Sequence, residues 1–189
     1  MKDSAHMAIY NLIFSLVLFA GILIYRYIYP KKKINLIVLL ILISILPLLS
    51  ILRPGSYESG DMSINAIKTM SFYSSLREGH FIPHWAGNLN ALYGYPLFVF
   101  TYPLPYYLAA FFHVFGFSFI DSIKCLLITA FIASGLTMYL FLKNEFGEKA
   151  AFVGSICYLF SPYHLMDMQF RVDIGETLAF VFLPSFFTE

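Results

Sequence analysis

Long apolar stretches dominate this chain and limit the folds that it can adopt. A helix that crosses the roughly 30 Å hydrocarbon core of a membrane needs about 20 predominantly apolar residues. Residues 7–29 and 34–52 reach that length, and the second stretch contains no charged residue. Hydrophobic residues make up 59% of the 189 residues and charged residues only 12%, whereas about a quarter of a soluble domain is charged. These values indicate a multi-pass protein of the cell (plasma or inner) membrane.

Three further stretches are candidates for membrane helices. Residues 117–142 are a third candidate, residues 150–163 are a short fourth, and residues 177–189 have the character of a span that the chain does not complete. We therefore expect an all-α polytopic membrane protein with about four or five transmembrane helices in a single module, residues 1–189. The unfinished last stretch favours a truncated N-terminal part of a longer protein.

Basic residues predict the orientation of these helices. The connection after the first span carries Arg26 and three lysines at 31–33, and the connection 143–149 carries two lysines. Cytoplasmic connections hold the excess of Lys and Arg, so we expect both on the cytoplasmic side, the N-terminus outside, and residues 53–116 in an outer loop. Between the outer loop and the connection 143–149 the chain then crosses the membrane once, through residues 117–142. Residues 96–116 therefore lie on the outer surface. The prolines in that stretch leave only about ten helical residues, roughly 15 Å. A crossing there is the alternative, and it would invert the topology downstream.

The outer loop 53–116 begins with two acids, Glu58 and Asp61. Apolar residues then recur at a spacing of three, which predicts an amphipathic helix at about 62–78 lying in the membrane interface. A second surface helix is expected at about 104–115. Carboxylates at a membrane surface are what an enzyme acting on lipid-linked substrates needs, so Asp61 and Glu58 are the catalytic candidates. Asp61 also precedes the first helix, where it could cap the first-turn amides, and both interpretations of Asp61 stay open.

Aromatic and histidine side chains are candidates for substrate binding. Trp85 and Tyr102 fit an aromatic belt at the lipid headgroups, and they also suit a platform on which a sugar stacks. His84 is interpreted as a solvated or phosphate-facing residue, because His80 and His84 have no further metal ligands close in the sequence. His164, at the start of a second outer loop, completes this set.

The second outer loop, residues 164–176, contains several charged residues close to the expected outer surface of the membrane. Charged groups at such a depth are usually paired or functional. Arg171 suits a phosphate, because its guanidinium group is a planar fork of donors. Asp173 and Glu176 would orient Arg171 or hold a divalent cation through oxygen atoms. The alternative is an ion pair of Arg171 with Asp173 or Glu176 that only pins the loop.

Several short motifs together resemble those of the bacterial membrane proteins labelled "6-pyruvoyl-tetrahydropterin synthase-related". The resemblance covers about residues 35–187, and the motifs lie at residues 79–87, 94–98, 102–107, 162–165 and 170–176. That family commonly has Arg where His84 stands. Soluble pterin synthases bind zinc through three histidines, and this sequence offers no such cluster.

The order of parts also resembles that of the GT-C membrane glycosyltransferases, such as protein O-mannosyltransferases and lipid A aminoarabinose transferases. In that superfamily an acidic motif in the first outer loop, a Pro-Pro-Leu-like helix start, a Phe-Gly turn and a further outer acid follow one another. Asp61, residues 102–105, residues 146–147 and residues 171–176 occupy those places here. The resemblance implies a polyprenyl-phosphate-linked sugar donor and an outer-loop carboxylate that acts as base or metal ligand.

The leading hypothesis from the sequence is therefore a GT-C-like glycosyltransferase fragment that transfers a sugar on the outer face of the membrane. Asp61 would be the general base and Arg171 would neutralise the donor phosphate. No cofactor is identified, and a divalent cation held by Asp61 and Glu176 stays open. The expected partners are a lipid-linked sugar donor and membrane lipids, and the net charge of +1 indicates no nucleic acid. The alternative is a non-catalytic membrane scaffold or lipid/polysaccharide-handling protein.

Overall fold

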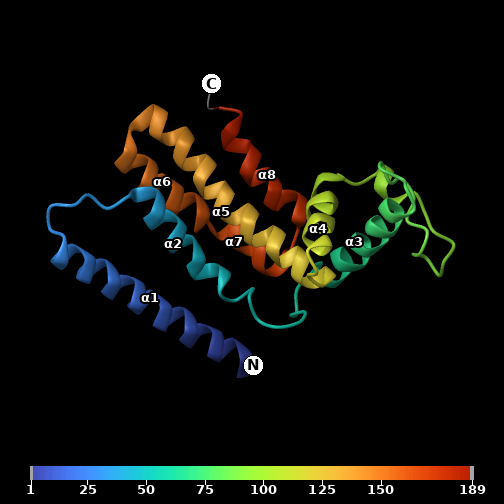
Figure 1. Cartoon of the computed structure of the whole chain (residues 1–189), viewed down its shortest axis with the longest axis horizontal. Coiled ribbons are helices and arrows are strands. Elements are labelled where there is room, and N and C mark those ends of the chain that lie inside the picture. The colour runs from blue at the N-terminus through green and yellow to red at the C-terminus, as the bar shows by residue number, and fades with distance from the viewer. Residues whose placement is uncertain (1, 188–189) are drawn as a thin grey trace. The chain divides into compact units, whose positions relative to one another are not determined.

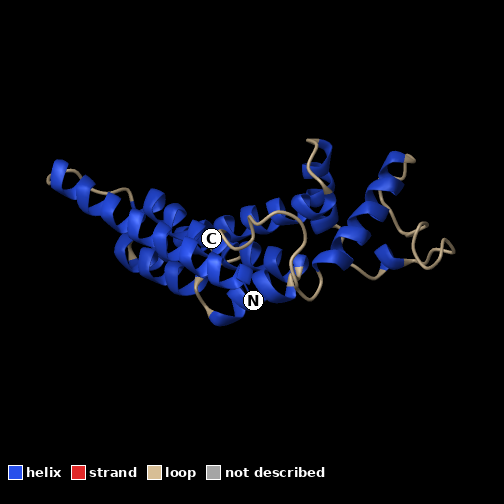
Figure 2. Cartoon of the chain, turned by 90° about the horizontal axis from the view of Figure 1, so that it is seen from below, coloured by secondary structure: helices blue, strands red, loops and turns tan. Residues whose placement is uncertain are grey.

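The computed structural model describes residues 2–187, and this part of the chain consists of helices and connections without a strand (Figures 1 and 2). Its contacts form two compact units. Unit 1 comprises residues 2–53, 131–165 and 180–187, and unit 2 comprises residues 54–130 and 166–179. The elements, in chain order, are α1 (Lys2–Ile28), α2 (Leu36–Leu48), α3 (Met62–Arg77), the 3₁₀ helix η1 (Leu97–Val99), α4 (Leu104–Val114), α5 (Phe119–Phe146), α6 (Glu148–Leu159), α7 (Pro162–Met166), the π-helix η2 (Asp167–Arg171) and α8 (Ile174–Ser185).

In unit 1, α1 and α2 form an antiparallel pair, and α2 also packs against α6 (Figure 1). The second helix begins where Asn35 caps it. The Asn35 Oδ1 accepts hydrogen bonds from the amides of Ile37, at 3.0 Å, and Val38, at 3.4 Å. Two otherwise unpaired amides of the first turn are thereby satisfied, which is why the helix begins at this residue.

Glycines allow α5 and α6 to approach each other closely within unit 1. A Cβ atom at Gly135 would overlap the side chain of Leu159, and one at Gly154 would overlap Leu142. Small residues at helix contacts are typical of membrane helices, where close backbone approach supplies the packing energy. The turn between the two helices is made by Gly147, which has a φ of 80° that an L side chain rarely adopts.

Within residues 2–187, two helical segments are long and apolar enough to cross a membrane, judged by length and composition: Ile9–Ile28 and Phe119–Phe146. The other expected spans coincide with shorter helices. α2 has 13 residues, and α6 and α8 have 12 each. At 1.5 Å per residue such helices are about 18–20 Å long, less than the roughly 30 Å hydrocarbon core. Four or five spans are therefore not confirmed, and α8 begins at Ile174 rather than at residue 177.

In unit 2, α3 and α4 pack around an aromatic cluster. Phe72 of α3 is completely buried. Its ring centroid lies 5.0 Å from that of Phe98, 5.6 Å from Tyr106 and 4.8 Å from Tyr107. Edge-to-face and stacked rings at these distances stabilise a fold beyond the area that they bury. This cluster explains why α3 and α4 form close to the ranges expected from the sequence.

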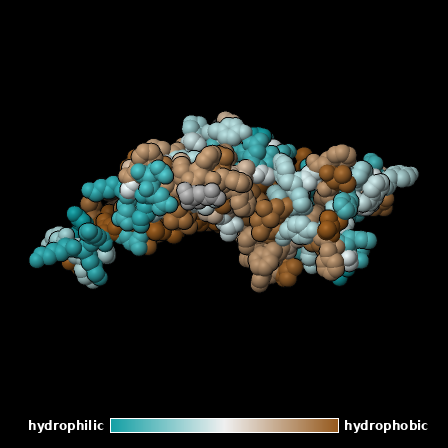
Figure 3. Space-filling view, turned by 90° about the horizontal axis from the view of Figure 1, so that it is seen from above, coloured by the Kyte–Doolittle hydropathy of each residue, from teal (hydrophilic) through white to brown (hydrophobic). Residues whose placement is uncertain are grey.

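The buried face of α3 is mixed, because polar residues lie on it beside Met62 and Phe72. Asn65 and Thr69 are buried, whereas Ile64, Ile67 and Met70 are 47%, 49% and 38% exposed. An exposed apolar stripe is compatible with the expected position of this helix at a membrane interface. Apolar side chains also occupy much of the molecular face drawn in Figure 3.

Lys124, near the start of α5, holds the first loop of unit 2. Its Nζ atom donates a hydrogen bond to the carbonyl oxygen of Gly55 at 2.6 Å and lies 3.5 Å from Asp121 Oδ1. The side chain is only 6% exposed, so its charge is paired rather than solvated. This contact fixes the chain where it enters the segment that contains Glu58 and Asp61.

Candidate functional site

Unit 2 contains a small polar cavity at the N-terminus of α3. Its volume is about 90 Å³, several times the roughly 10–15 Å³ that one water molecule requires. The cavity is lined by residues from α3, from the start of α4 and from the turn before α8: Asp61, Asn65, Lys68, Thr101, Tyr102, Tyr106, Asp173 and Ile174. It therefore joins the two segments that the sequence analysis expected to form outer loops.

Backbone hydrogen bonds hold these two segments together. The amide of Gly60 donates to the carbonyl of Phe170 at 2.7 Å, and the amide of Asp61 donates to the carbonyl of Arg171 at 2.9 Å. The side chain of Asn65 donates to the carbonyl of Val172 at 2.8 Å. A Cβ at position 60 would lie 3.1 Å from the Arg171 carbonyl oxygen, so glycine suits this close approach.

Asp61 is the N-cap residue of α3, but its side chain makes no capping hydrogen bond. The backbone carbonyl of Asp61 accepts the first helical bond, from the amide of Asn65 at 2.8 Å. The carboxylate is exposed and lines the cavity. Of the two interpretations left open by the sequence, side-chain capping does not hold, because the carboxylate faces the cavity instead.

Lys68 is a cavity residue that the sequence analysis did not select. Asp61, Asn65 and Lys68 are spaced by four and three residues, so they lie on one face of α3. Lys68 is half-buried and is the cation among the described residues that line the cavity. The i, i+4, i+7 spacing from Asp61 is the signal that could have identified it.

Two tyrosines, Tyr102 and Tyr106, form part of the cavity wall. Burial, followed by the charges of Asp173 and Glu176, raises the pKa of Tyr102 above its ordinary value. Burial, followed by Tyr102 and Asp173, also raises the pKa of Tyr106. Both hydroxyls therefore keep their protons at neutral pH and remain hydrogen-bond donors. A Cβ at Gly175 would overlap the Tyr102 ring, so the ring packs directly on the backbone of α8.

Arg171 is surrounded by carboxylates. Its two terminal nitrogens donate to Glu176 at 3.0 and 3.1 Å, a bidentate pair. Nη1 also lies 3.1 Å from Asp167 Oδ1, and Nη2 lies 3.8 Å from Asp173 Oδ2. Asp173 uses its other oxygen to cap α8, accepting from the amides of Gly175 and Glu176 at 2.9 and 3.1 Å. The guanidinium group of Arg171 thus contacts three acids. This arrangement agrees with the alternative in which Arg171 forms an ion pair that holds the loop. The pair of N–H donors that would bind a phosphate is bound to Glu176 instead.

Asp167 is the buried member of this cluster. Its side chain is 1% exposed. Burial, followed by the negative charge of Glu176, raises the pKa of Asp167 to about 7, although Arg171 acts in the opposite direction. This carboxyl group therefore changes its charge near neutral pH, and the cluster around Arg171 carries either two or three negative charges.

The cluster is shaped by an unusual backbone. The π-helix η2 ends at Val172, which adopts the left-handed conformation with φ 57° and ψ 45°. That conformation is a genuine outlier for a β-branched residue. The surrounding contacts hold this conformation. The Val172 side chain is completely buried, and its amide donates to the backbone carbonyl of Asp167 at 2.7 Å. Its carbonyl accepts a hydrogen bond from the side chain of Asn65. Strain of this kind often occurs at functional sites.

Several residues predicted for the site lie elsewhere. Glu58 is exposed and does not line the cavity. His84 and Trp85 line a different hollow of unit 2, of about 230 Å³, together with Glu78 and His80. The Trp85 ring packs so closely on Gly94 that a Cβ there would overlap it. The prediction of one substrate site containing His84, Trp85 and Asp61 is therefore not matched by this arrangement.

The structure places His164, a substrate-binding candidate from the sequence, in the core of unit 1. The side chain is completely buried, and its ring stacks on Phe180 with centroids 4.1 Å apart. Its Nδ1 lies 3.3 Å from the carbonyl oxygen of Tyr158. Burial lowers the pKa of His164 to about 4, so the ring is neutral at physiological pH and offers no charge to a phosphate.

Among the residues whose side chains the structure describes, 9–187, no group of three or more His, Cys, Asp or Glu is placed to hold a metal ion. Glu176, one of the two metal ligands considered from the sequence, is bound to Arg171. Asp61 lines the cavity together with one other acid, Asp173. The structure therefore places Glu176 against Arg171 and Asp61 at the cavity, and a divalent cation held by these two acids stays a prediction.

Comparison of the chain with protein-family models, with curated proteins and with solved structures finds no match.

Proposed function

We propose that the chain carries the catalytic carboxylate of a GT-C-like membrane glycosyltransferase that uses a polyprenyl-phosphate-linked sugar. The observation that carries this proposal is the Asp61 carboxylate, which is not used for helix capping and lines a polar cavity with Lys68, Tyr102 and Tyr106. A base, a cation and hydroxyl donors in one cavity are the groups that transfer of a sugar from a phosphate requires.

In the proposed reaction, Asp61 accepts the proton of an acceptor hydroxyl group. The hydroxyl oxygen forms a bond to the anomeric carbon of the donor sugar from the face opposite the phosphate. The bond between that carbon and the phosphate oxygen breaks, and its electron pair leaves with the polyprenyl phosphate. The products are the glycosylated acceptor with inverted configuration and polyprenyl phosphate, and Asp61 returns its proton to solvent.

Lys68 takes the electrostatic role that the sequence analysis gave to Arg171. A lysine ammonium group binds phosphate as a point charge, and Lys68 shares the cavity with Asp61. Arg171 is held by Asp167, Asp173 and Glu176, so its role in the proposal is to position the turn before α8. That turn places Asp173 and Ile174 in the cavity wall.

The substitution Asp61→Asn tests the proposal, because it preserves the size of the side chain and removes the base. Membranes containing the full-length protein are incubated with polyprenyl-phosphate-linked hexoses, and release of polyprenyl phosphate is measured, which does not require the acceptor to be known. We expect the rate to fall by about 10²–10⁴-fold, the usual contribution of a general base.

Glu78→Gln is the matched control, since Glu78 is an exposed acid at the opposite end of α3. We expect this variant to release polyprenyl phosphate at the unsubstituted rate. Expression level and thermal unfolding of both variants show whether the fold is retained. Unchanged release in a folded Asp61→Asn variant would exclude the catalytic assignment and favour the non-catalytic scaffold.

A further inference from the structure

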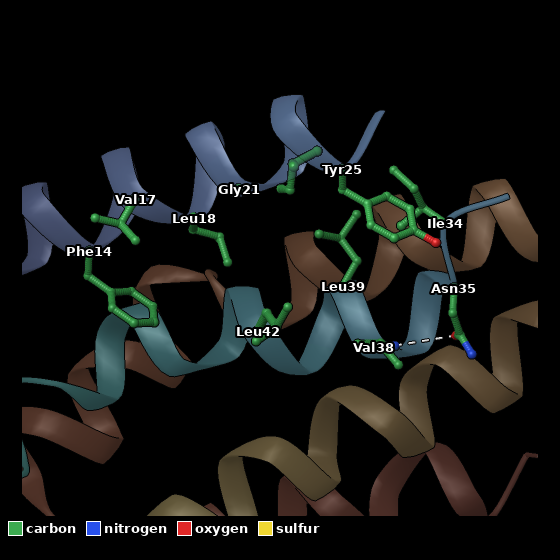
Figure 4. Close-up of a pocket in the computed structure, with 11 residues that line it drawn as sticks. Phe14, Val17, Leu18, Gly21, Tyr25, Ile34, Asn35, Val38, Leu39 and Leu42 are labelled. Atoms are coloured by element: carbon green, nitrogen blue, oxygen red, sulfur yellow. Dashed lines mark hydrogen bonds between the residues drawn. The ribbon is translucent and has the colours of Figure 1, made fainter. Parts of the chain in front are cut away.

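An apolar groove runs between α1 and α2 in unit 1 (Figure 4). Its volume is about 550 Å³, within the roughly 300–1,000 Å³ range of ligand pockets. Side chains of α1, including Phe14, Leu18 and Tyr25, point toward α2, from which Leu39 and Leu42 line the opposite wall. The groove therefore has two walls made by helices, with hydrocarbon side chains on both.

The groove is open at its centre because Gly21 lies there. A Cβ at Gly21 would meet no atom within 4 Å. Ile9–Ile28 is one of the two segments able to span a membrane, and none of its most apolar window is buried within the structure. The polar group of Asn35 at the groove's end is occupied by capping α2. Hydrocarbon, rather than water or a polar ligand, is the chemistry that fits such a space.

One end of the groove is strongly basic. The connection between the lining residues Tyr25 and Ile34 contains Arg26, Lys31, Lys32 and Lys33, all exposed, and no acidic residue. Lys32 Nζ lies 5.2 Å from the ring centroid of Tyr29, at the same connection.

Glu148 is an acid near this connection: its pKa is lowered chiefly by its hydrogen bond with Lys143 and, to a smaller extent, by Lys33. The Glu148 carboxylate is itself paired with Lys143 at 2.9 Å. The connection itself therefore offers four exposed basic side chains to an anionic ligand.

We propose that the α1–α2 groove binds one acyl chain of an anionic phospholipid whose headgroup phosphate contacts Lys31, Lys32 and Lys33. Within a bilayer an acyl chain gains little by leaving other acyl chains, because lipid tails are as apolar as leucine. The groove therefore fixes the position of the lipid, and the lysines select its headgroup. The proposal concerns unit 1 and does not depend on the catalytic role of Asp61.

Photocrosslinking in nanodiscs tests this proposal on the full-length protein. Phosphatidylglycerol and phosphatidylcholine, each with a diazirine in the same acyl chain, are compared, and the crosslinked peptides are mapped by mass spectrometry. We expect phosphatidylglycerol to label α1 and α2 about tenfold or more above phosphatidylcholine, since each basic residue near the membrane surface favours anionic lipid several-fold. The triple substitution K31Q/K32Q/K33Q should bring the two lipids close to parity.

Gly21→Phe tests the groove separately from the charge, because the Cβ at position 21 would meet no atom within 4 Å and the ring would extend into the space between the helices. We expect it to reduce labelling by both lipids at least several-fold, whereas Gly21→Ala, which leaves most of the space open, should retain it. Equal labelling by the two lipids in the unsubstituted protein would overturn the headgroup assignment. Unchanged labelling in Gly21→Phe, or a change only in oligomeric state, would overturn the proposal in favour of a second copy's helix in the groove.

Discussion

Asp61 and Asp167 are two acids of unit 2 whose surroundings assign them different roles. Asp61 is exposed and lines the cavity, whereas Asp167 is buried beside Arg171. Burial disfavours the charged form of a carboxyl group, and two neighbouring carboxylates strengthen that effect more than one arginine offsets it. The free carboxylate is therefore the candidate for chemistry, and the buried one is a group whose charge affects stability.

Asp167→Asn should change the pH dependence of unfolding. The folded-state pKa of Asp167, about 7, lies above its ordinary value of 3.8, so its contribution to stability is fully present below about pH 4 and is lost as the pH rises through 7. The asparagine variant lacks that loss, so its melting temperature relative to the unsubstituted protein should increase between pH 5 and pH 8. The free-energy difference across this range is on the order of a few kcal/mol.

Thermal melts of the detergent-solubilised protein measure this effect. Glu145→Gln, which removes an exposed acid, is the control and should leave the pH profile unchanged. Parallel profiles for Asp167→Asn and the unsubstituted protein would contradict the altered pKa of Asp167.

At the scale of elements, the junction between η2 and α8 determines the wall of the cavity. The left-handed Val172 ends the π-helix, Asp173 caps α8, and the Tyr102 ring lies against Gly175. The left-handed residue, the helix cap and the close glycine contact lie within four consecutive residues. We therefore expect a small change at this junction to alter the position of Tyr102. The first turn of α8 is therefore positioned in part by its contact with Tyr102, which lies just before α4.

Gly175→Ala should destabilise the protein, although the same change in an exposed helix would normally be favourable by up to about 1 kcal/mol. The added Cβ would overlap the Tyr102 ring, and overpacking typically costs about 1–3 kcal/mol. Gly87→Ala is the matched control in unit 2, since the nearest atom to its added Cβ lies at an ordinary contact distance of 3.8 Å. Thermal unfolding of the two variants distinguishes them, and equal melting temperatures would argue against the close packing of Tyr102 on α8.

At the scale of the whole molecule, two helices in the described part of the chain are long and apolar enough to cross a membrane, and basic residues mark two connections. The first connection contains Lys31, Lys32 and Lys33, and the second contains Lys143 and Lys149. If basic connections face the cytoplasm, both lie on the same side. That arrangement requires one further crossing between the two connections in addition to α5, and the 13-residue α2 is the segment predicted from the sequence to supply it.

Cysteine labelling tests this topology in a background in which Cys125 and Cys157 are replaced by alanine. Lys32→Cys and Asn144→Cys should react with a membrane-impermeant maleimide only after the cells are opened. His80→Cys, at an exposed position of unit 2, should react in intact cells. Labelling of positions 32 and 144 from opposite sides would show that the chain between them crosses the membrane differently from the prediction.

The sequence predicted the elements whose causes are local. The range 62–78 was expected to be helical and is α3 (Met62–Arg77), and the range 104–115 is α4 (Leu104–Val114). Apolar spacing, glycine and proline determine such elements within a few residues, so they can be recognised without knowledge of the fold. Lengths of apolar runs were less informative, because 34–52 and 150–163 contain helices too short to be counted as spans.

What only the tertiary structure decided is which polar residues remain available for chemistry. The hydrogen bond from Asn65 to Val172 joins positions 107 residues apart, and it belongs to the contacts that bring Asp61 beside the turn before α8. In the resulting structure Asp61 and Lys68 line a cavity, and Arg171 is paired with three acids. The spacing of residues along the sequence does not predict these contacts. The burial of His164 among aromatic rings is likewise a result of packing between distant segments. The sequence by itself determined a helical, apolar chain with its charges gathered in a few connections, and the non-local contacts determined which of those charges are free.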